Sequence, residues 1–213
     1  MTELTLYYSN GACSLTPHIA LEETGAAYSP IRVDTPGGEQ HRPAFLAVNP
    51  KARVPALRID DWVLTECPAI LAYVAEAYPD AGLWPAGSAD QARAAEWMAW
   101  LASTVHVAYA HIRRGERYAT GDDAQANVRA QGHVTTRAAW EAVEHRLRPG
   151  AWAVGDAYSV VDPYLLVFWL WGRGAVLGYD MAHDFPVWTG LARRMGARPA
   201  VQRVLAREGA VLP

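Results

Sequence analysis

A cysteine follows a turn close to the start of the chain, at the junction between a short apolar strand and a helix. Residues 9–14 contain Asn10 and Gly11, which favour a turn, and then Cys13. Helix N-termini carry partial positive charge and unpaired amides, which favour a thiolate over a thiol. Cys13 is therefore a candidate nucleophile for disulfides or electrophiles. Position alone also allows the blander interpretation of a small buried hydrophobe, the commoner fate of a lone cysteine.

Two further segments offer groups that a ligand could use. Pro55 opens an apolar strand, where a cis peptide bond and exposed backbone groups would suit an extended peptide ligand. The alternative is an ordinary trans proline at a strand edge. Thr65, Glu66 and Cys67 precede a helix whose first amides could hold a carboxylate, or could form a plain helix cap.

The elements around these residues alternate through the first 79 positions and are helical after position 88. Residues 79–88 contain two prolines and two glycines and indicate a linker. We expect a β-α-β-α-β-β-α domain over residues 1–79 and an all-helical domain over residues 88–213. The expected strands are 4–8, 28–33, 56–59 and 62–64, and the expected helices are 14–23, 41–47, 68–78, one through 97–112, 124–147 ended by Pro149 and Gly150, one from Ser159, 185–195 and 199–207.

Composition excludes several classes of partner. The chain is 51% hydrophobic, enough for a sizeable core, and its formal net charge of −3 predicts no nucleic-acid partner. Its most apolar run, residues 164–172, is shorter than the roughly 20 residues that cross a bilayer, and the N-terminus lacks a signal-peptide pattern. The two cysteines form neither a CxxC nor a metal-ligand pattern. We therefore expect a cytoplasmic protein with free thiols, no metal, no membrane contact and no Cys13–Cys67 disulfide.

Taken in order, these segments resemble bacterial glutathione transferases of the beta class over essentially the whole chain. The matching motifs are 6–18 (LYYSNGACSLTPH), 49–57 (NPKARVPAL), 64–70 (LTECPAI), 97–106 (WMAWLASTVH), 158–166 (YSVVDPYLL) and 198–202 (RPAVQ). The resemblance implies a thioredoxin-like domain that carries the glutathione site, followed by a helical domain that builds most of the second-substrate pocket. It also implies a homodimer.

The resemblance also assigns roles to residues. It places Cys13 and His106 in catalysis, with Cys13 able to form a mixed disulfide with glutathione, the co-substrate. The implied glutathione-binding residues are Ala12, Cys13, Arg53, Val54, Pro55, Glu66, Cys67 and Ser103. The implied second-substrate residues are Tyr8, His106, Tyr109 and Arg113. Ser159 and Asp162 match the family's capping box, which we assign to folding.

Some positions depart from the family pattern. Cys67 stands where many relatives carry serine, a stronger hydrogen-bond donor. The loop 35–38 lacks a lysine that relatives often place there, and Ala99 and Val107 replace asparagine and lysine. Since a hydrogen bond to a charged group contributes roughly 1.5–3 kcal/mol, these losses suggest weaker glutathione binding. They also motivate an alternative, a non-catalytic ligand-binding or scaffold protein of the same fold with a degenerate glutathione site.

Two mechanisms stay open for an enzyme. In one, bound glutathione ionises and its thiolate attacks an electrophilic small molecule. In the other, Cys13 is the nucleophile and exchanges disulfides with glutathione. Cysteine suits the second mechanism better because a thiol is a poor donor to a thiolate, although Tyr8, Ser9 and Ser14 are candidate hydroxyl donors for the first.

Overall fold

A four-stranded mixed sheet forms the N-terminal half of the computed structural model, which describes residues 2–147 and 152–212. The strands are β1 (Leu4–Tyr8), β2 (Ser29–Arg32), β3 (Ala56–Ile59) and β4 (Trp62–Thr65), in the order β2-β1-β3-β4. β1 is buried along its whole length because it lies inside the sheet, parallel to β2 and antiparallel to β3. The expected order of elements in this half is confirmed.

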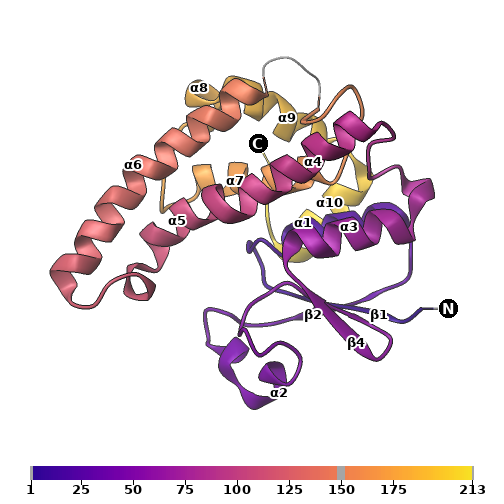
Figure 1. The fold of residues 1–213 in the computed structure, drawn as a ribbon, viewed down its shortest axis with the longest axis horizontal. Coiled ribbons are helices and arrows are strands. Elements are labelled where there is room, and N and C mark those ends of the chain that lie inside the picture. The colour runs from indigo at the N-terminus through magenta and orange to yellow at the C-terminus, as the bar shows by residue number, and fades with distance from the viewer. Residues whose placement is uncertain (1, 148–151, 213) are drawn as a thin grey trace.

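Two helices cover the face of this sheet that is turned toward the rest of the molecule. They are α1 (Leu15–Thr24) and α3 (Cys67–Ala77), while the short α2 (Pro43–Leu46) lies on the other side of the sheet (Figure 1). α2 is shorter than the expected helix over 41–47. Arg42 adopts an extended backbone before Pro43, as residues before proline do, so a short 3-10 turn over Glu39–His41 stays separate.

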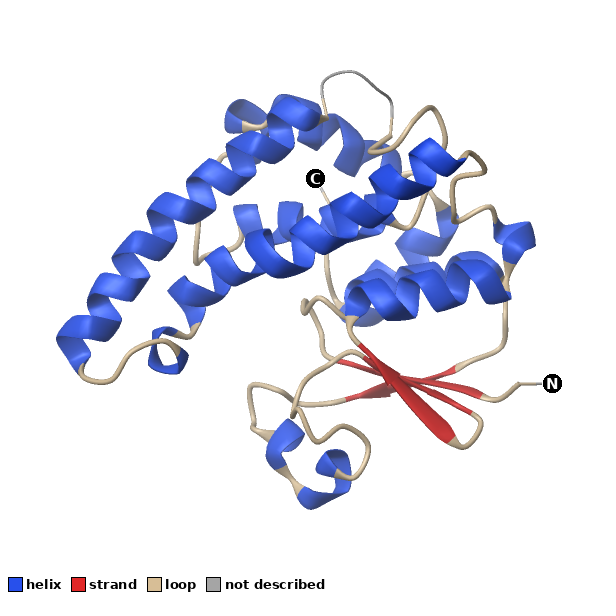
Figure 2. Cartoon of the chain, in the orientation of Figure 1, coloured by secondary structure: helices blue, strands red, loops and turns tan. Residues whose placement is uncertain are grey.

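After a 3-10 turn over Pro79–Ala81, the second half of the chain is helical, as the sequence predicts (Figure 2). The helices are α4 (Ser88–Trp100), α5 (His106–Arg113), α6 (Asp122–Arg146), α7 (Val161–Arg173), α8 (Met181–Asp184), α9 (Pro186–Gly196) and α10 (Pro199–Glu208). The four-residue α8 is too short for a periodic pattern and was not expected. Pro149 and Gly150, which we expect to end α6, lie outside the described residues.

The single helix predicted through residues 97–112 is interrupted. A π-helical segment, Leu101–Val105, lies between α4 and α5 and shifts the register just before His106. Such insertions are often found at functional sites. The apolar stripe itself is confirmed, since Trp97, Leu101 and Val105 are all buried.

α7 lies at the centre of the helical half and packs against α1, α4 and α9. The first nine residues of α7, from Val161 to Trp169, are buried. A cap closes the start of α7, where Asp162 accepts the amide of Ser159 at 2.8 Å and that of Ala153 at 2.9 Å. This half of the predicted capping box is confirmed. The Ser159 hydroxyl differs from the prediction, because it accepts the Val161 amide at 3.4 Å rather than the amide of Asp162.

α10 returns to the N-terminal half, where side chains of its ends form hydrogen bonds with α1. The side chains of Glu208 and His18 of α1 are fully buried and hydrogen-bonded, with 2.7 Å between the carboxylate oxygen and Nδ1. Arg198 binds Glu23 through two hydrogen bonds of 2.6 and 3.0 Å. Across the part of the chain that the structure describes, none of the helices is long and apolar enough to span a membrane.

Candidate functional site

Cys13 lies in the turn between β1 and α1, with its side chain partly exposed and free of any disulfide. Its thiol faces the Val54 carbonyl, 3.6 Å from Sγ to oxygen. Hydrogen bonding with the Cys67 thiol lowers the pKa of Cys13, and the backbone at Cys13 and Ser14 adds to this effect, against the opposing effect of burial. The turn therefore holds a thiol that ionises more readily than an ordinary cysteine.

Cys67 is the first residue of α3 and is 5% exposed. Its thiol donates to the Cys13 carbonyl oxygen, 3.5 Å from sulfur to oxygen. As a donor to Cys13 in a buried position, Cys67 has its pKa raised well above the usual range. Hydrogen bonding with the Tyr164 hydroxyl of α7 acts in the opposite direction and lowers it.

The segment before β3 carries the predicted proline. The Val54–Pro55 peptide bond is cis. Asn49 supports this segment by donating to the Arg53 carbonyl at 2.6 Å, while the Arg53 side chain is exposed. Within residues 2–147 and 152–212, the Val54 amide donates to no protein acceptor. A backbone donor therefore stays available beside the Cys13 thiol.

Glu66 lies immediately before α3 with a positive φ of 75°, an unusual conformation for a residue with a side chain. Its carboxylate binds Lys51, 2.7 Å from Nζ, and Lys51 also donates to the Thr65 hydroxyl at 2.8 Å. Both side chains of this ion pair are exposed. The first turn of α3 keeps unpaired amides beside them, which favour an anion.

Side chains of the helical half form hydrogen bonds with the loop that carries Cys13. Trp171 of α7 donates its indole N–H to the Gly11 carbonyl at 2.8 Å, and Glu208 of α10 accepts the Gly11 amide at 3.2 Å. Tyr109 of α5 stacks on the Trp171 ring at 4.5 Å between centroids. These contacts fix the Cys13 turn against the second half.

His106, at the start of α5, packs edge-on against Trp171 at 5.0 Å and Phe168 at 6.0 Å. Burial lowers the pKa of His106 to about 4, and the charges of Arg53 and Arg114 add to this effect. The imidazole is therefore neutral at physiological pH. The charge of Arg53, beside Val54, therefore acts on His106 from the N-terminal half.

Two of the hydroxyl donors considered for a bound thiolate, those of Ser9 and Ser14, are engaged elsewhere. Ser14 is fully buried, accepting the Ser9 amide at 3.0 Å and donating to the Ser9 carbonyl at 3.2 Å. The Ser9 hydroxyl pairs with Thr35 at 2.8 Å. Tyr8, expected to contact a second substrate, is 6% exposed and packs on His18 at 4.6 Å. The ring of Tyr8 belongs to the core, and its contact with a second substrate stays a prediction.

The other predicted site residues differ in their exposure and in their neighbours. Ala12 is half-buried beside Cys13, and Tyr109 is half-buried against Trp171. Arg113 is exposed at the end of α5, with Tyr109 within range of its charge. Ser103 is exposed in the π-helical segment, where its hydroxyl lies 3.5 Å from that of Thr104. No contact within the described residues brings Ser103 to Cys13.

Comparison with known proteins agrees with this arrangement. A family model described as "Glutathione S-transferase, N-terminal domain" matches residues 2–76. Glutathione S-transferase GstA of Escherichia coli O157:H7 is 31% identical over 209 residues, covering 97% of this chain and 99% of its own. The chain belongs to the glutathione S-transferase family. It is a glutathione S-transferase with a thioredoxin-like N-terminal domain and a helical C-terminal domain.

Solved structures of the family share the whole fold. A glutathione transferase homologue from Sulfitobacter, solved with bound glutathione, is 41% identical and covers 99% of this chain and 100% of its own, with a TM-score of 0.90. The beta-class glutathione S-transferase of Sphingomonas chungbukensis is 35% identical, covers 97% of this chain and 100% of its own, and has a TM-score of 0.82.

Sequence reasoning missed two residues of this glutathione S-transferase that lie against the predicted site. Tyr164 lowers the pKa of Cys67, and Trp171 donates to the backbone of the Cys13 loop. Tyr164 and Trp171 lie in the apolar run that we interpreted only as core. The sequence offered one signal for them. Each carries a polar group inside the apolar run, a hydroxyl or an indole N–H, and such groups usually find a hydrogen-bond partner when buried.

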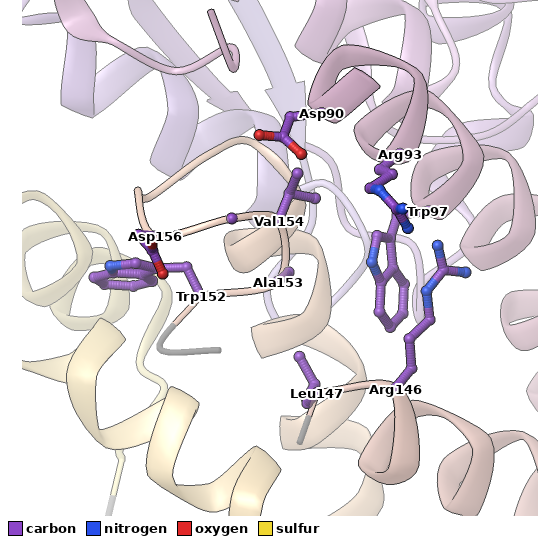
Figure 3. Close-up of a pocket in the computed structure, with 10 residues that line it drawn as sticks. Asp90, Arg93, Trp97, Arg146, Leu147, Trp152, Ala153, Val154 and Asp156 are labelled. Atoms are coloured by element: carbon purple, nitrogen blue, oxygen red, sulfur yellow. The ribbon is translucent and has the colours of Figure 1, made fainter. Parts of the chain in front are cut away.

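A separate pocket of about 280 Å³ opens between α4, the end of α6 and residues 152–156 (Figure 3). Trp97, Trp152 and Arg146 line it, with the Arg146 guanidinium 4.2 Å from the Trp97 ring centroid. None of the predicted site residues takes part, so we assign it no role in the glutathione chemistry. Among the described residues, no cluster of His, Cys, Asp and Glu could hold a metal ion.

Proposed function

We propose that this transferase binds glutathione between the Val54 segment and the start of α3, with the glutathione sulfur beside Cys13. The observation that carries the proposal is the half-exposed Cys13 thiol, whose pKa is lowered and which lies 3.6 Å from the Val54 carbonyl. The same place offers the unpaired Val54 amide to the peptide backbone of a ligand. An extended peptide is recognised in this manner through main-chain hydrogen bonds.

Charges around the same site fit the carboxylates of glutathione. The first turn of α3 presents unpaired amides and the positive end of the helix dipole. Lys51 and Arg53 are exposed cations on the neighbouring segment. Glu66 is an acceptor for an amino group, which the γ-glutamyl end of glutathione carries. Together these residues complement both ends of the peptide.

The proposed reaction at Cys13 is thiol–disulfide exchange. The Cys13 thiolate attacks the glutathione sulfur of a mixed disulfide, so the old S–S bond breaks and the other thiol leaves with a proton from solvent. Reduced glutathione then attacks the Cys13–glutathione disulfide and releases oxidised glutathione. Conjugation of bound glutathione to an electrophilic small molecule is the parallel activity, in which the glutathione thiolate attacks carbon.

The helical half supplies the proposed second-substrate side. Tyr109 is half-buried and stacked, and neutral His106 can donate or accept one hydrogen bond without carrying charge. Arg113 and Arg114 are exposed at the end of α5 and add positive charge near this side. We also propose a homodimer with a cytoplasmic location, which chromatography and cell fractionation test directly.

The test of this function compares the protein with its Cys13→Ala variant in three assays. Titration calorimetry measures glutathione binding, a reductase assay uses a glutathione mixed disulfide, and a conjugation assay uses an aryl halide. We expect binding by both proteins and exchange only by the unsubstituted one. Absence of binding by either protein would overturn the proposal and support a non-catalytic scaffold.

A further inference from the structure

A second thiol beside Cys13 has no role in the exchange reaction described above. Cys67 is buried at the start of α3, and the Cys67 sulfur lies 3.5 Å from the Cys13 carbonyl oxygen. Hydrogen bonding with Cys67 also lowers the pKa of Cys13. These two are the only cysteines of the chain, and both are free. They come from different helix starts that the sequence separates by more than fifty residues.

The two sulfurs meet different neighbours. The Val54 carbonyl, in the segment proposed to hold glutathione, contacts the Cys13 sulfur. Cys67 approaches from the start of α3, and the Tyr164 hydroxyl of α7 lowers its pKa. The Cys67 thiol donates to the backbone carbonyl of the residue that would carry glutathione, 3.5 Å from sulfur to oxygen. A disulfide on Cys13 would have a protein thiol beside it in the folded state.

We propose that Cys67 is a resolving cysteine, which attacks the Cys13–glutathione mixed disulfide and releases glutathione. The proposal rests on the proposed function, since it needs glutathione on Cys13. In the step, the S–S bond between Cys13 and glutathione breaks and a Cys13–Cys67 S–S bond forms. The proton of the Cys67 thiol ends on the released glutathione thiol. The oxidant is oxidised glutathione, which is reduced to two glutathione molecules while the two protein thiols are oxidised.

Attachment of glutathione to Cys13 would also change the pKa of the Cys67 thiol. While Cys13 is a thiolate, its hydrogen bond with Cys67, together with burial and the Cys13 charge, raises the pKa of Cys67. Once glutathione caps the Cys13 sulfur, that sulfur is neutral and both influences of Cys13 vanish. Burial and Glu66 still raise the pKa of Cys67, and the Tyr164 hydroxyl lowers it. Formation of the mixed disulfide thus removes the two influences of Cys13 that favour a protonated Cys67.

The test follows intact mass after the reduced protein is mixed with oxidised glutathione and quenched with acid over time. Four proteins are compared: the unsubstituted chain, Cys67→Ser, Cys67→Ala and Cys13→Ser. We expect the unsubstituted chain to lose its glutathione adduct and end two hydrogen atoms lighter than the reduced form. We expect both Cys67 variants to retain one glutathione per chain, and Cys13→Ser to form neither product. The alanine variant covers the case in which serine disturbs folding, which circular dichroism monitors.

The remaining outcomes separate this inference from the function on which it rests. If the unsubstituted chain retains its adduct as long as the Cys67 variants do, Cys67 is not a resolving cysteine, while exchange at Cys13 stands. If neither the unsubstituted chain nor the Cys67 variants form an adduct or a disulfide, exchange at Cys13 itself is overturned, and the resolving role with it. In that case calorimetry still reports separately whether glutathione binds.

Discussion

The starts of α1 and α7 each contain a serine, but one start is closed to solvent and the other leaves a thiol accessible. At α7, Asp162 accepts two backbone amides and is fully buried, so the turn is closed to solvent. At α1, the Ser14 hydroxyl bonds the Ser9 backbone, and the Cys13 thiol stays half-exposed with sulfur contacts of 3.5 Å or more. The comparison shows how one helix start stabilises the fold while the other keeps a reactive group available.

Cys13→Ala gives the largest expected effect on activity. We expect thiol–disulfide exchange to fall to the background rate, because the nucleophile is absent. The free energy of unfolding should change by less than about 1 kcal/mol, since a half-exposed side chain contributes little packing. A coupled reductase assay and urea unfolding measure the two quantities. If the variant still catalysed exchange, the start of α1 would not supply the reactive thiol.

Asp162→Ala gives the largest expected effect on stability. We expect the free energy of unfolding to fall by about 2–4 kcal/mol, because the Ser159 and Ala153 amides lose their buried acceptor. Urea unfolding measures the loss, and calorimetry on the folded variant should show unchanged glutathione affinity. Asp162→Asn keeps one acceptor oxygen and serves as the milder control. A large loss of affinity with little loss of stability would contradict the assignment of this cap to folding.

His106 predicts a smaller, pH-dependent effect. Its folded pKa of about 4 lies below the unfolded value of about 6.5, so the unfolded chain binds the extra proton between these values. Stability should therefore fall as the pH is lowered from about 6.5 to about 4. We expect this part of the loss to be about 1–2 kcal/mol for a half-buried ring.

The matched variant for this effect is His106→Phe, which keeps an aromatic ring against Trp171 and Phe168 but cannot titrate. Thermal unfolding at several pH values compares the two proteins. The difference between their stabilities should change across the acid range and stay constant above neutral pH. A difference that is constant at all pH values would show that His106 is not held neutral by burial.

Tyr164→Phe gives the smallest expected effect. The hydroxyl lowers the pKa of Cys67, so its removal should raise that pKa. Release of glutathione from the preformed Cys13 adduct should then need a correspondingly higher pH. Mass spectrometry of the adduct at a series of pH values measures the midpoint. An unchanged midpoint would mean that Tyr164 only packs against Cys67.

The sequence predicted the elements well where local signals are strong. β1 has the predicted bounds, and the core helix after Ser159 begins only two residues later than expected. Prolines and glycines predicted the boundary between the two halves. The π-helical segment Leu101–Val105 could not be predicted, because the apolar stripe of a π-helical insertion differs little from that of a continuous helix. α8 escaped prediction because four residues carry no period.

The site was predictable in its local parts and not in its long-range contacts. The Cys13 turn, the cis Pro55 and the helix start at Cys67 each have a local sequence signal, and the structure forms all three. The contact between the two thiols depends on how α1 and α3 pack on the sheet. No spacing in the sequence reports that packing.

The central claim is that the start of α1 holds an easily ionised thiol at the place where glutathione binds. The rate at which Cys13 is alkylated by iodoacetamide, followed by peptide mass spectrometry as a function of pH, tests it most directly. The structure predicts a midpoint below the usual cysteine pKa of about 8.5 and slower alkylation when glutathione is present. An ordinary midpoint together with no protection by glutathione would contradict the account.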